Sequence, residues 1–219
     1  MNIINTSDPK VVAEFIAKKI ISKLEAGRRV LWLVPGGSSI VATAIAAKII
    51  SSHPHENLTV MPGDERFGPV GHTDSNWFQM EKEGFSLPGA RLVPLLTGDD
   101  RETTTKKYAE NLKKYIAEAD YVLGFFGVGA DGHTAGMLPG TPPLRSSEFA
   151  ASYQAAQYER VTVTPLVIDE LDEVVAFAVG ENKCPILKNL KQEVPIEDNP
   201  VQLLKRVPEF TLFTDCAIS

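Results

Sequence analysis

The residues best suited to carry out chemistry lie in one glycine-rich stretch, residues 127 to 140, which reads GVGADGHTAGMLPG. It places an imidazole, His133, two residues after a carboxylate, Asp131. An imidazole titrates near neutral pH, and glycines let the backbone approach a ligand closely. The combination suits a general base. The alternative is that His133 only caps the following turn.

The same stretch matches two nucleotide-binding templates incompletely. It satisfies G-x-G-x-x-G through Gly127, Gly129 and Gly132. The acidic residue with nearly the right spacing, Glu148, follows PGTPPLRSS, which interrupts the helix that a dinucleotide-binding unit requires. A P-loop needs a lysine where this chain has His133, and a mostly neutral imidazole does not supply that charge. Both nucleotide templates are therefore disfavoured.

Two strand-and-turn units are expected to position these residues. The glycine-rich stretch begins within an apolar run, residues 121 to 129, which has the composition of a buried strand. A second glycine turn, PGGSS at residues 35 to 39, separates another apolar run from a helical segment. The pattern predicts helices over residues 9–26, 40–50, 75–83, 103–119 and 182–190. It predicts strands over residues 28–34, 121–129, 160–164, 173–179 and 209–215, with a further strand and its exit loop over 57–66.

Alternating strands and helices predict one α/β domain over residues 1–219. We expect a mostly parallel, Rossmann-like open sheet with helices on both faces. In such sheets ligands bind beyond the carboxyl ends of the strands, where both glycine turns are expected to lie.

Composition and charge limit the classes of partner. The 219 residues are 43% hydrophobic and 23% charged, which is ordinary for a globular protein, and their formal net charge is -6. This charge and the lack of a basic cluster disfavour nucleic acid, whereas a small anion needs only a few local positive groups. The sequence has neither a run of about 18 apolar residues nor a secretory signal, so no membrane partner and a cytoplasmic location are expected.

The cysteines and the other histidines carry little signal. Cys184 and Cys216 lack metal-ligand spacing and are expected to be free thiols. His53, His55 and His72 are expected to have no role in catalysis or metal binding. We therefore predict no metal and no organic cofactor.

Four segments, in the same order along the chain, resemble motifs of the 6-phosphogluconolactonases, a family similar in fold to the glucosamine-6-phosphate deaminases. The stretch GVGADGHTAGMLPG resembles their GxGxDGHTASLFPG, and VPGGSS resembles their phosphate loop SGGST. GDERFGPVGHTDSN resembles their DER followed by SN, and ERVTVTPLVID with GENK resembles their arginine strand and late lysine. The resemblance implies hydrolysis of 6-phospho-D-glucono-1,5-lactone in the oxidative pentose phosphate pathway. We expect the protein to act as a monomer or homodimer.

This substrate has a phosphate at one end and an ester at the other. Backbone N–H groups and hydroxyls at the start of a helix form an anion site for the phosphate. The resemblance adds two cationic partners from later in the chain. The groups expected at this end are Gly36, Gly37, Ser38, Ser39, Arg160 and Lys183.

At the ester end, neutral His133 is expected to take a proton from the water that attacks the lactone carbonyl, while Asp131 orients the imidazole or favours its charged form. Arg66 or the backbone amides of residues 127 to 132 stabilise the charge that develops on the carbonyl oxygen. Asp64 holds sugar hydroxyls or the water; the alternative is that residues 64 to 66 form an ion-paired loop. The chain has no G-x-S-x-G motif, and no covalent nucleophile is required.

Two other functions remain open. The resemblance extends to the deaminases, which usually have a glutamate five residues after the histidine. Here that position is Leu138, which cannot transfer a proton, so hydrolysis is favoured. The second alternative is a sugar-phosphate-binding protein that has lost turnover, which retention of Asp131 and His133 disfavours.

Overall fold

Seven parallel strands form the central sheet of the protein. The computed structural model describes residues 1–218. The strand order is β1-β10-β9-β6-β2-β3-β5, and every neighbouring pair is parallel. The strands are β1 (Asn2–Asn5), β2 (Val30–Val34), β3 (Leu58–Pro62), β5 (Arg91–Leu92), β6 (Tyr121–Gly127), β9 (Glu173–Ala178) and β10 (Glu209–Thr214). The predicted α/β class and parallel sheet are confirmed.

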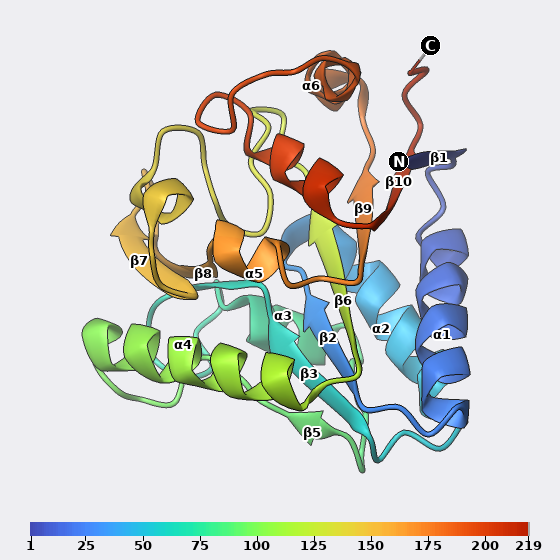
Figure 1. Cartoon of the computed structure of the whole chain (residues 1–219). Coiled ribbons are helices and arrows are strands. Elements are labelled where there is room, and N and C mark those ends of the chain that lie inside the picture. The colour runs from blue at the N-terminus through green and yellow to red at the C-terminus, as the bar shows by residue number, and fades with distance from the viewer. Residues whose placement is uncertain (219) are drawn as a thin grey trace.

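Helices cover both faces of this sheet, with α1 and α2 on one side and α4 and α5 on the other (Figure 1). Strand β2 explains how one apolar run serves two faces. Its Trp32 side chain lies in the core under α1 and α2, and the adjacent Leu31 and Leu33 lie in the core under α4, because successive side chains point to opposite faces. The helices are α1 (Pro9–Glu25), α2 (Ile40–Ile50), α3 (Asn76–Lys82), α4 (Arg101–Glu118), α5 (Pro165–Ile168) and α6 (Cys184–Lys188). Short 3-10 turns are η1 (Gly37–Ser39), η2 (Pro142–Arg145), η3 (Glu181–Lys183), η4 (Asn189–Lys191) and η5 (Pro200–Arg206).

Capping residues set the starts of the long helices. Asp8 accepts a hydrogen bond from the Lys10 amide at 2.8 Å, so α1 begins at Pro9 as predicted. Asp100 likewise accepts from the Thr103 amide at 2.9 Å, and α4 begins two residues before the predicted start.

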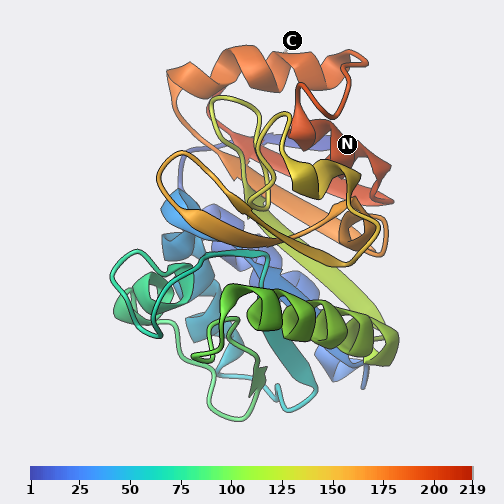
Figure 2. The same cartoon turned by 90° about the vertical axis from the view of Figure 1, so that its left-hand side faces the viewer.

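A second, three-stranded antiparallel sheet lies beside the first, in the order β4-β8-β7 (Figure 2). Its strands are β4 (Asp64–Arg66), β7 (Ala150–Gln154) and β8 (Glu159–Val163). The predicted strand over residues 160–164 is therefore real but belongs to this sheet, and the predicted exit loop after β3 contains β4. This small sheet carries charged residues to the carboxyl edge of the large one.

The prediction of free thiols is wrong. Cys184 and Cys216 form a disulfide, with their Cα atoms 5.3 Å apart. They meet because β9 and β10 are neighbours in the sheet and each cysteine follows the end of one of these strands. Within residues 1–218, no helix is long and apolar enough to cross a membrane.

Candidate active site

The loops at the carboxyl edge of the large sheet and the small sheet together enclose a cleft of about 180 Å³. Six separate segments contribute to its wall: the turn after β2, strand β4, the start of α3, the loop after β6, strand β8 and turn η3, the last two with one cation each. The lining residues are Gly36, Gly37, Ser38, Asp64, Arg66, Asn76, Gly127, Val128, Gly129, His133, Gly136, Arg160 and Lys183. This edge is the one expected to bind ligands in a parallel sheet.

The turn after β2 leads directly into η1 and α2. Gly37 has a φ of 62°, a conformation that favours glycine. At Gly36 a Cβ would lie 2.1 Å from Oδ1 of Asn76, so the turn needs a glycine there to pack on that side chain. Ser38 is exposed in the cleft, whereas Ser39 is fully buried and does not line it. The turn therefore presents backbone and one hydroxyl at the N-terminal end of α2, where an anion is favoured.

The loop after β6 brings a carboxylate and an imidazole together. Nδ1 of His133 lies 2.6 Å from Oδ1 of Asp131, which also accepts the His133 amide at 3.1 Å. A Cβ at Gly129 would lie 2.1 Å from Nδ1, so the ring packs directly on glycine backbone. The hydrogen bond from His133 lowers the pKa of Asp131, which therefore stays ionised.

This contact fixes the roles of the two ring nitrogens. An ionised carboxylate only accepts hydrogen bonds, so Nδ1 of His133 carries the proton and Nε2 carries the lone pair. No hydrogen bond joins Nε2 to any other residue between positions 1 and 218. Neutral His133 therefore has a basic nitrogen free to act on a ligand in the cleft.

The small sheet holds the chain that follows His133. The Tyr153 hydroxyl on β7 donates to the carbonyl of Gly136 at 2.7 Å, and the Thr162 hydroxyl on β8 donates to the carbonyl of Ala135. Burial raises the pKa of Tyr153 to about 12, so the phenol remains a donor at neutral pH. Ala135 has a φ of 48°, which is unusual for a residue with a side chain. Side chains from both strands thus hold a strained turn beside the cleft.

Asp64 and Arg160 form a largely enclosed ion pair. Oδ2 of Asp64 lies 2.8 Å from Nη1 of Arg160, and their side chains are only 9% and 14% exposed. Asn76 Nδ2 donates to the Asp64 carbonyl at 3.0 Å. Both charged residues line the cleft, but each already has its opposite charge.

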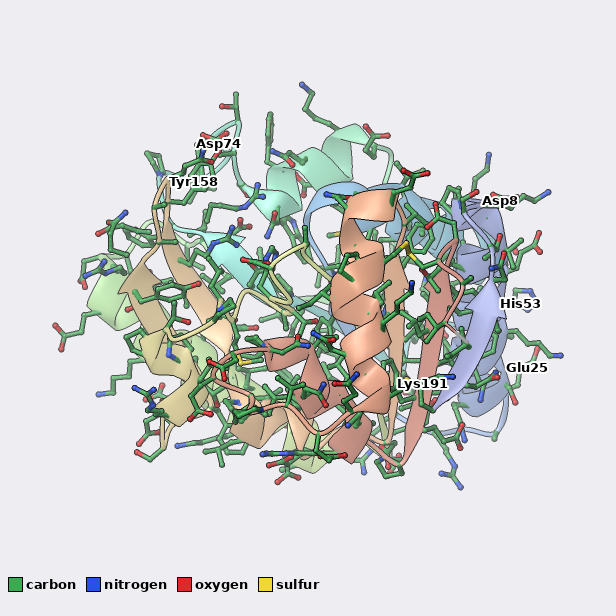
Figure 3. The ribbon with its side chains drawn as sticks, turned by 90° about the horizontal axis from the view of Figure 1, so that it is seen from above. Asp8, Glu25, His53, Asp74, Tyr158 and Lys191 are labelled. Carbon is green, nitrogen blue, oxygen red and sulfur yellow. A yellow bond between two sulfur atoms is a disulfide. The ribbon has the colours of Figure 1, made fainter. Side chains whose placement is uncertain are left out.

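Arg66 has no carboxylate partner among residues 1–218. Its Nη1 donates to the backbone carbonyl of Asp74 at 2.9 Å, and its guanidinium lies 5.3 Å from the ring centroid of Tyr158. Figure 3 looks down on this edge of the sheet, and its labels place Asp74 and Tyr158 close together at the rim. These contacts hold Arg66 while leaving its charge free for a ligand.

Glu65, which lies between Asp64 and Arg66 in β4, faces away from the cleft and has a structural role. Its fully buried carboxylate accepts hydrogen bonds from the Ser75 hydroxyl and from the backbone N–H groups of Asn76 and Trp77 at the start of α3. Burial raises the pKa of Glu65, and these hydrogen bonds oppose the shift. Glu65 thereby fixes the position of Asn76 in the cleft wall.

Lys183, in η3, is a second cation with no carboxylate within ion-pair distance in the described chain. Desolvation lowers the pKa of Lys183, and the nearby charge of Asp215 partly opposes this. A half-buried ammonium group without a partner is suited to an anionic ligand.

Most predicted site residues therefore meet in one cleft, with two exceptions. Ser39 is buried behind it, and Asp131 contacts the ring of His133 rather than the cleft itself. Asn76 was not predicted as a site residue, although it lies in the GDERFGPVGHTDSN segment. The sequence signal for it was the SN that follows DER.

The other three histidines make contacts that need no ligand. Both ring nitrogens of His55 lie against backbone carbonyls, at 2.6 and 2.9 Å. His72 Nε2 lies 2.9 Å from the carbonyl of Arg66, and His53 lies 3.6 Å from Glu25 at the surface. Within residues 1–218, no group of three or more histidine, cysteine or acidic side chains is placed to hold a metal ion.

The model of the glucosamine-6-phosphate isomerase/6-phosphogluconolactonase family matches residues 8–212. The chain is 29% identical over 133 residues to the 6-phosphogluconolactonase of Chlamydia pneumoniae, a match that covers 58% of this chain and only 51% of that protein. It is 23% identical over 216 residues to the 6-phosphogluconolactonase of Haemophilus influenzae, covering 94% of this chain and 91% of that protein.

A solved structure of a monomeric glucosamine-6-phosphate deaminase is also similar, with a TM-score of 0.81 and 16% identity, over 98% of this chain and 97% of that one. At this identity the similarity shows the fold alone, so it does not distinguish lactone hydrolysis from deamination. The family model, by contrast, spans nearly the whole chain, and the chain belongs to the glucosamine-6-phosphate isomerase/6-phosphogluconolactonase family.

Proposed function

We propose that the protein hydrolyses 6-phospho-D-glucono-1,5-lactone to 6-phosphogluconate. The observation that carries the proposal is the Asp131–His133 pair, which leaves Nε2 of the imidazole free in a cleft that also holds unpaired cations. The names of the curated relatives support the same activity. The substrate has a cyclic ester on which His133 can act as a base through water, and a phosphate dianion that the cations of the cleft can bind.

In the proposed mechanism His133 acts as a general base on water. Nε2 takes a proton as the water oxygen adds to the lactone carbonyl carbon, and the carbonyl π electrons move to the oxygen. The intermediate collapses by breaking the bond between that carbon and the ring oxygen, which takes the proton back from the imidazolium. The new carboxylic acid then ionises, so each turnover releases one proton to solvent.

Asp131 stabilises the imidazolium that forms and keeps the ring in the productive orientation. Backbone N–H groups of the 127 to 132 loop are candidate donors for the developing oxyanion, except those of Gly129 and Gly132, which already donate to the carbonyls of His133 and Gly129. No covalent bond between the enzyme and the substrate is needed, because the cyclic ester is within reach of water activated by a base.

For the phosphate end we propose a division of roles among the cations that differs from the one the sequence suggested. Arg160 is paired with Asp64, and breaking that enclosed pair to bind phosphate would leave a carboxylate unpaired. Arg66 and Lys183 have no such partner, so we assign the phosphate to them, together with Ser38 and the N-terminal end of α2. Arg160 then positions Asp64, which remains available to the sugar hydroxyls.

The deaminase alternative is weakened by one position in the loop. Leu138, which follows the histidine by five residues, has no proton to transfer. The proposal further includes a cytoplasmic enzyme that acts as a monomer or homodimer without metal or cofactor. Light scattering on the purified protein would measure the oligomeric state.

The direct test is acid release from freshly made lactone, with the uncatalysed rate subtracted. His133→Ala should lower kcat by about 10²- to 10⁴-fold, since general-base catalysis contributes that much, and should leave binding of 6-phosphogluconate nearly unchanged. His53→Gln, a surface histidine variant, is the matched control and should retain wild-type rates.

Three outcomes separate the candidate functions. Lactone hydrolysis that depends on His133 supports the proposal. Release of ammonia from glucosamine 6-phosphate would instead identify a deaminase. Binding of 6-phosphogluconate without turnover of either substrate would identify a sugar-phosphate-binding protein.

A further inference from the structure

The segment that carries Lys183 is held by the C-terminal end of the chain. Strands β9 and β10 end side by side, with Ala178 opposite Thr214, so the residues after each strand leave the sheet together. The backbone N–H of Gly180 donates to both carboxylate oxygens of Asp215, at 3.0 and 3.2 Å. Cys184, four residues after Gly180, is bonded to Cys216, the residue after Asp215, and Figure 3 draws such a bond in yellow.

These two contacts flank the backbone at Lys183 on one side, while the fully buried Leu187 anchors the following helix α6 in the core. The turn η3 contains only three residues and lacks a side-chain cap. One of its backbone hydrogen bonds runs from the Lys183 amide to the Gly180 carbonyl, at 3.0 Å, and Gly180 is itself the residue that Asp215 holds. A second runs from the Cys184 amide to the Glu181 carbonyl. The disulfide begins at the residue after Lys183. Along the chain, Lys183 thus lies between two residues, Gly180 and Cys184, that are attached to the same C-terminal segment.

We propose that Asp215 and the Cys184–Cys216 disulfide are positioning groups for Lys183, and that reducing the disulfide weakens binding of the phosphate end of the substrate. The proposal rests on the proposed function for the identity of that substrate. Neither group contacts the reacting ester, which lies with His133 on a different loop. Substrate affinity therefore depends on the redox state of the protein, and KM should change more than kcat.

The two sulfur atoms differ in access, which sets the order of reduction. Cys184 is partly exposed and Cys216 is 3% exposed. The thiolate of a small dithiol attacks Sγ of Cys184, the S–S bond breaks, and its electron pair goes to Sγ of Cys216, which takes a proton. The second thiol of the reagent then attacks the reagent sulfur that is bonded to Cys184, and Cys184 is released as a thiol. Two electrons and two protons pass to the protein, and the reagent becomes a cyclic disulfide.

The test compares oxidised protein, protein reduced with dithiothreitol, and Cys184→Ser/Cys216→Ser. We measure KM and kcat for the lactone, and the Kd of 6-phosphogluconate by calorimetry. Reduction should raise KM and Kd about tenfold, the factor that corresponds to about 1.4 kcal/mol and to re-ordering roughly one residue of backbone on binding. The double serine variant should match reduced wild type and should not respond to dithiothreitol.

A second pair of variants tests whether the effect passes through Lys183. In Lys183→Met the charge is absent, so oxidised and reduced protein should bind 6-phosphogluconate equally weakly. Asp215→Asn should raise KM in the oxidised protein, and Asp215→Glu, which keeps the charge, should restore part of the affinity. Near-ultraviolet circular dichroism on each form verifies that tertiary packing is retained under assay conditions.

The possible results distinguish an error in the positioning role from an error in the proposed enzymatic function. If the lactone is hydrolysed with the same KM in oxidised and reduced protein, the positioning role is wrong and the enzymatic function stands. If 6-phosphogluconate binds in a redox-dependent way but no lactone is hydrolysed, the positioning role stands and the function is wrong. If reduction weakens binding of 6-phosphogluconate to Lys183→Met as much as it weakens binding to wild type, the positioning role is also wrong.

Discussion

Replacing Asp64 by Asn tests whether the enclosed ion pair stabilises the fold. The change keeps the shape of the side chain and removes its charge. It leaves the Arg160 guanidinium only 14% exposed, without its carboxylate 2.8 Å away. Nε of Arg160 already has no hydrogen-bond partner within residues 1–218, so the variant would have to retain a poorly solvated charge.

The expected loss of stability follows from the separation and the burial of the pair. Two unit charges 2.8 Å apart attract by about 6 kcal/mol at an effective dielectric constant of about 20. Desolvation of both groups offsets part of this, and removing one partner of a buried pair costs about 3–5 kcal/mol. Because neither side chain is completely enclosed, we expect the lower end, about 3 kcal/mol, for Asp64→Asn.

Urea unfolding measures this quantity as the free energy of unfolding extrapolated to water. Asp64→Asn and Arg160→Met should each be destabilised, whereas the double variant should be more stable than the sum of the two losses predicts. The control is Glu148→Gln, which removes an exposed ion pair with Lys113 and should cost less than about 1 kcal/mol. A loss below about 1 kcal/mol in Asp64→Asn, or additive effects in the double variant, would refute the reasoning.

Two further predictions concern the two ends of the cleft. Gly129→Ala places a Cβ 2.1 Å from Nδ1 of His133, so it should displace the ring and lower kcat about 10²-fold or more while the Kd of 6-phosphogluconate stays within about twofold; a wild-type kcat would contradict the assigned base. Lys183→Met should weaken binding of 6-phosphogluconate yet raise the melting temperature of the free protein at pH 7, because burial disfavours the charged amine. In the folded protein the pKa of Lys183 lies below its usual 10.5. The charged lysine therefore destabilises the fold fully below the folded pKa and not at all above about pH 10.5. A difference in stability between Lys183→Met and wild type that grew with pH would contradict this.

The large sheet could be predicted from the sequence because its signal is local. In β2, five consecutive apolar residues have the composition of a strand buried on both faces, and the structure uses alternate residues for two different cores. The small sheet could not be predicted in the same way. Strand β4 has three residues, all charged, and it forms a sheet only by pairing with β8, whose Arg160 is 96 positions from Asp64. Pairing at that distance leaves no trace in local composition.

The same distinction applies to the cleft. Parallel strands bring the turns after β2 and β6 to one edge, so glycines and His133 could be placed there from the sequence. The sequence did not reveal that Arg160 is neutralised by Asp64, because that depends on the register of the small sheet. It also did not reveal the disulfide. Cysteine spacing and count suggested free thiols, and only the adjacency of β9 and β10 brings the two sulfur atoms together.

The cleft presents local positive charge although the protein has a net charge of -6. At physiological ionic strength charges separated by more than about 8 Å are largely screened, so the groups that line the cleft matter more than the total. Three cations line it, and Asp64 neutralises one of them. The two that remain, Arg66 and Lys183, match the charge of a phosphate monoester. If Arg160 were also free, the excess positive charge would favour binding any phosphate at the expense of release after hydrolysis. In the function proposed above, the enclosed pair therefore has two effects: it holds Asp64 near the sugar hydroxyls, and it leaves the cleft with two uncompensated cations for a dianionic phosphate.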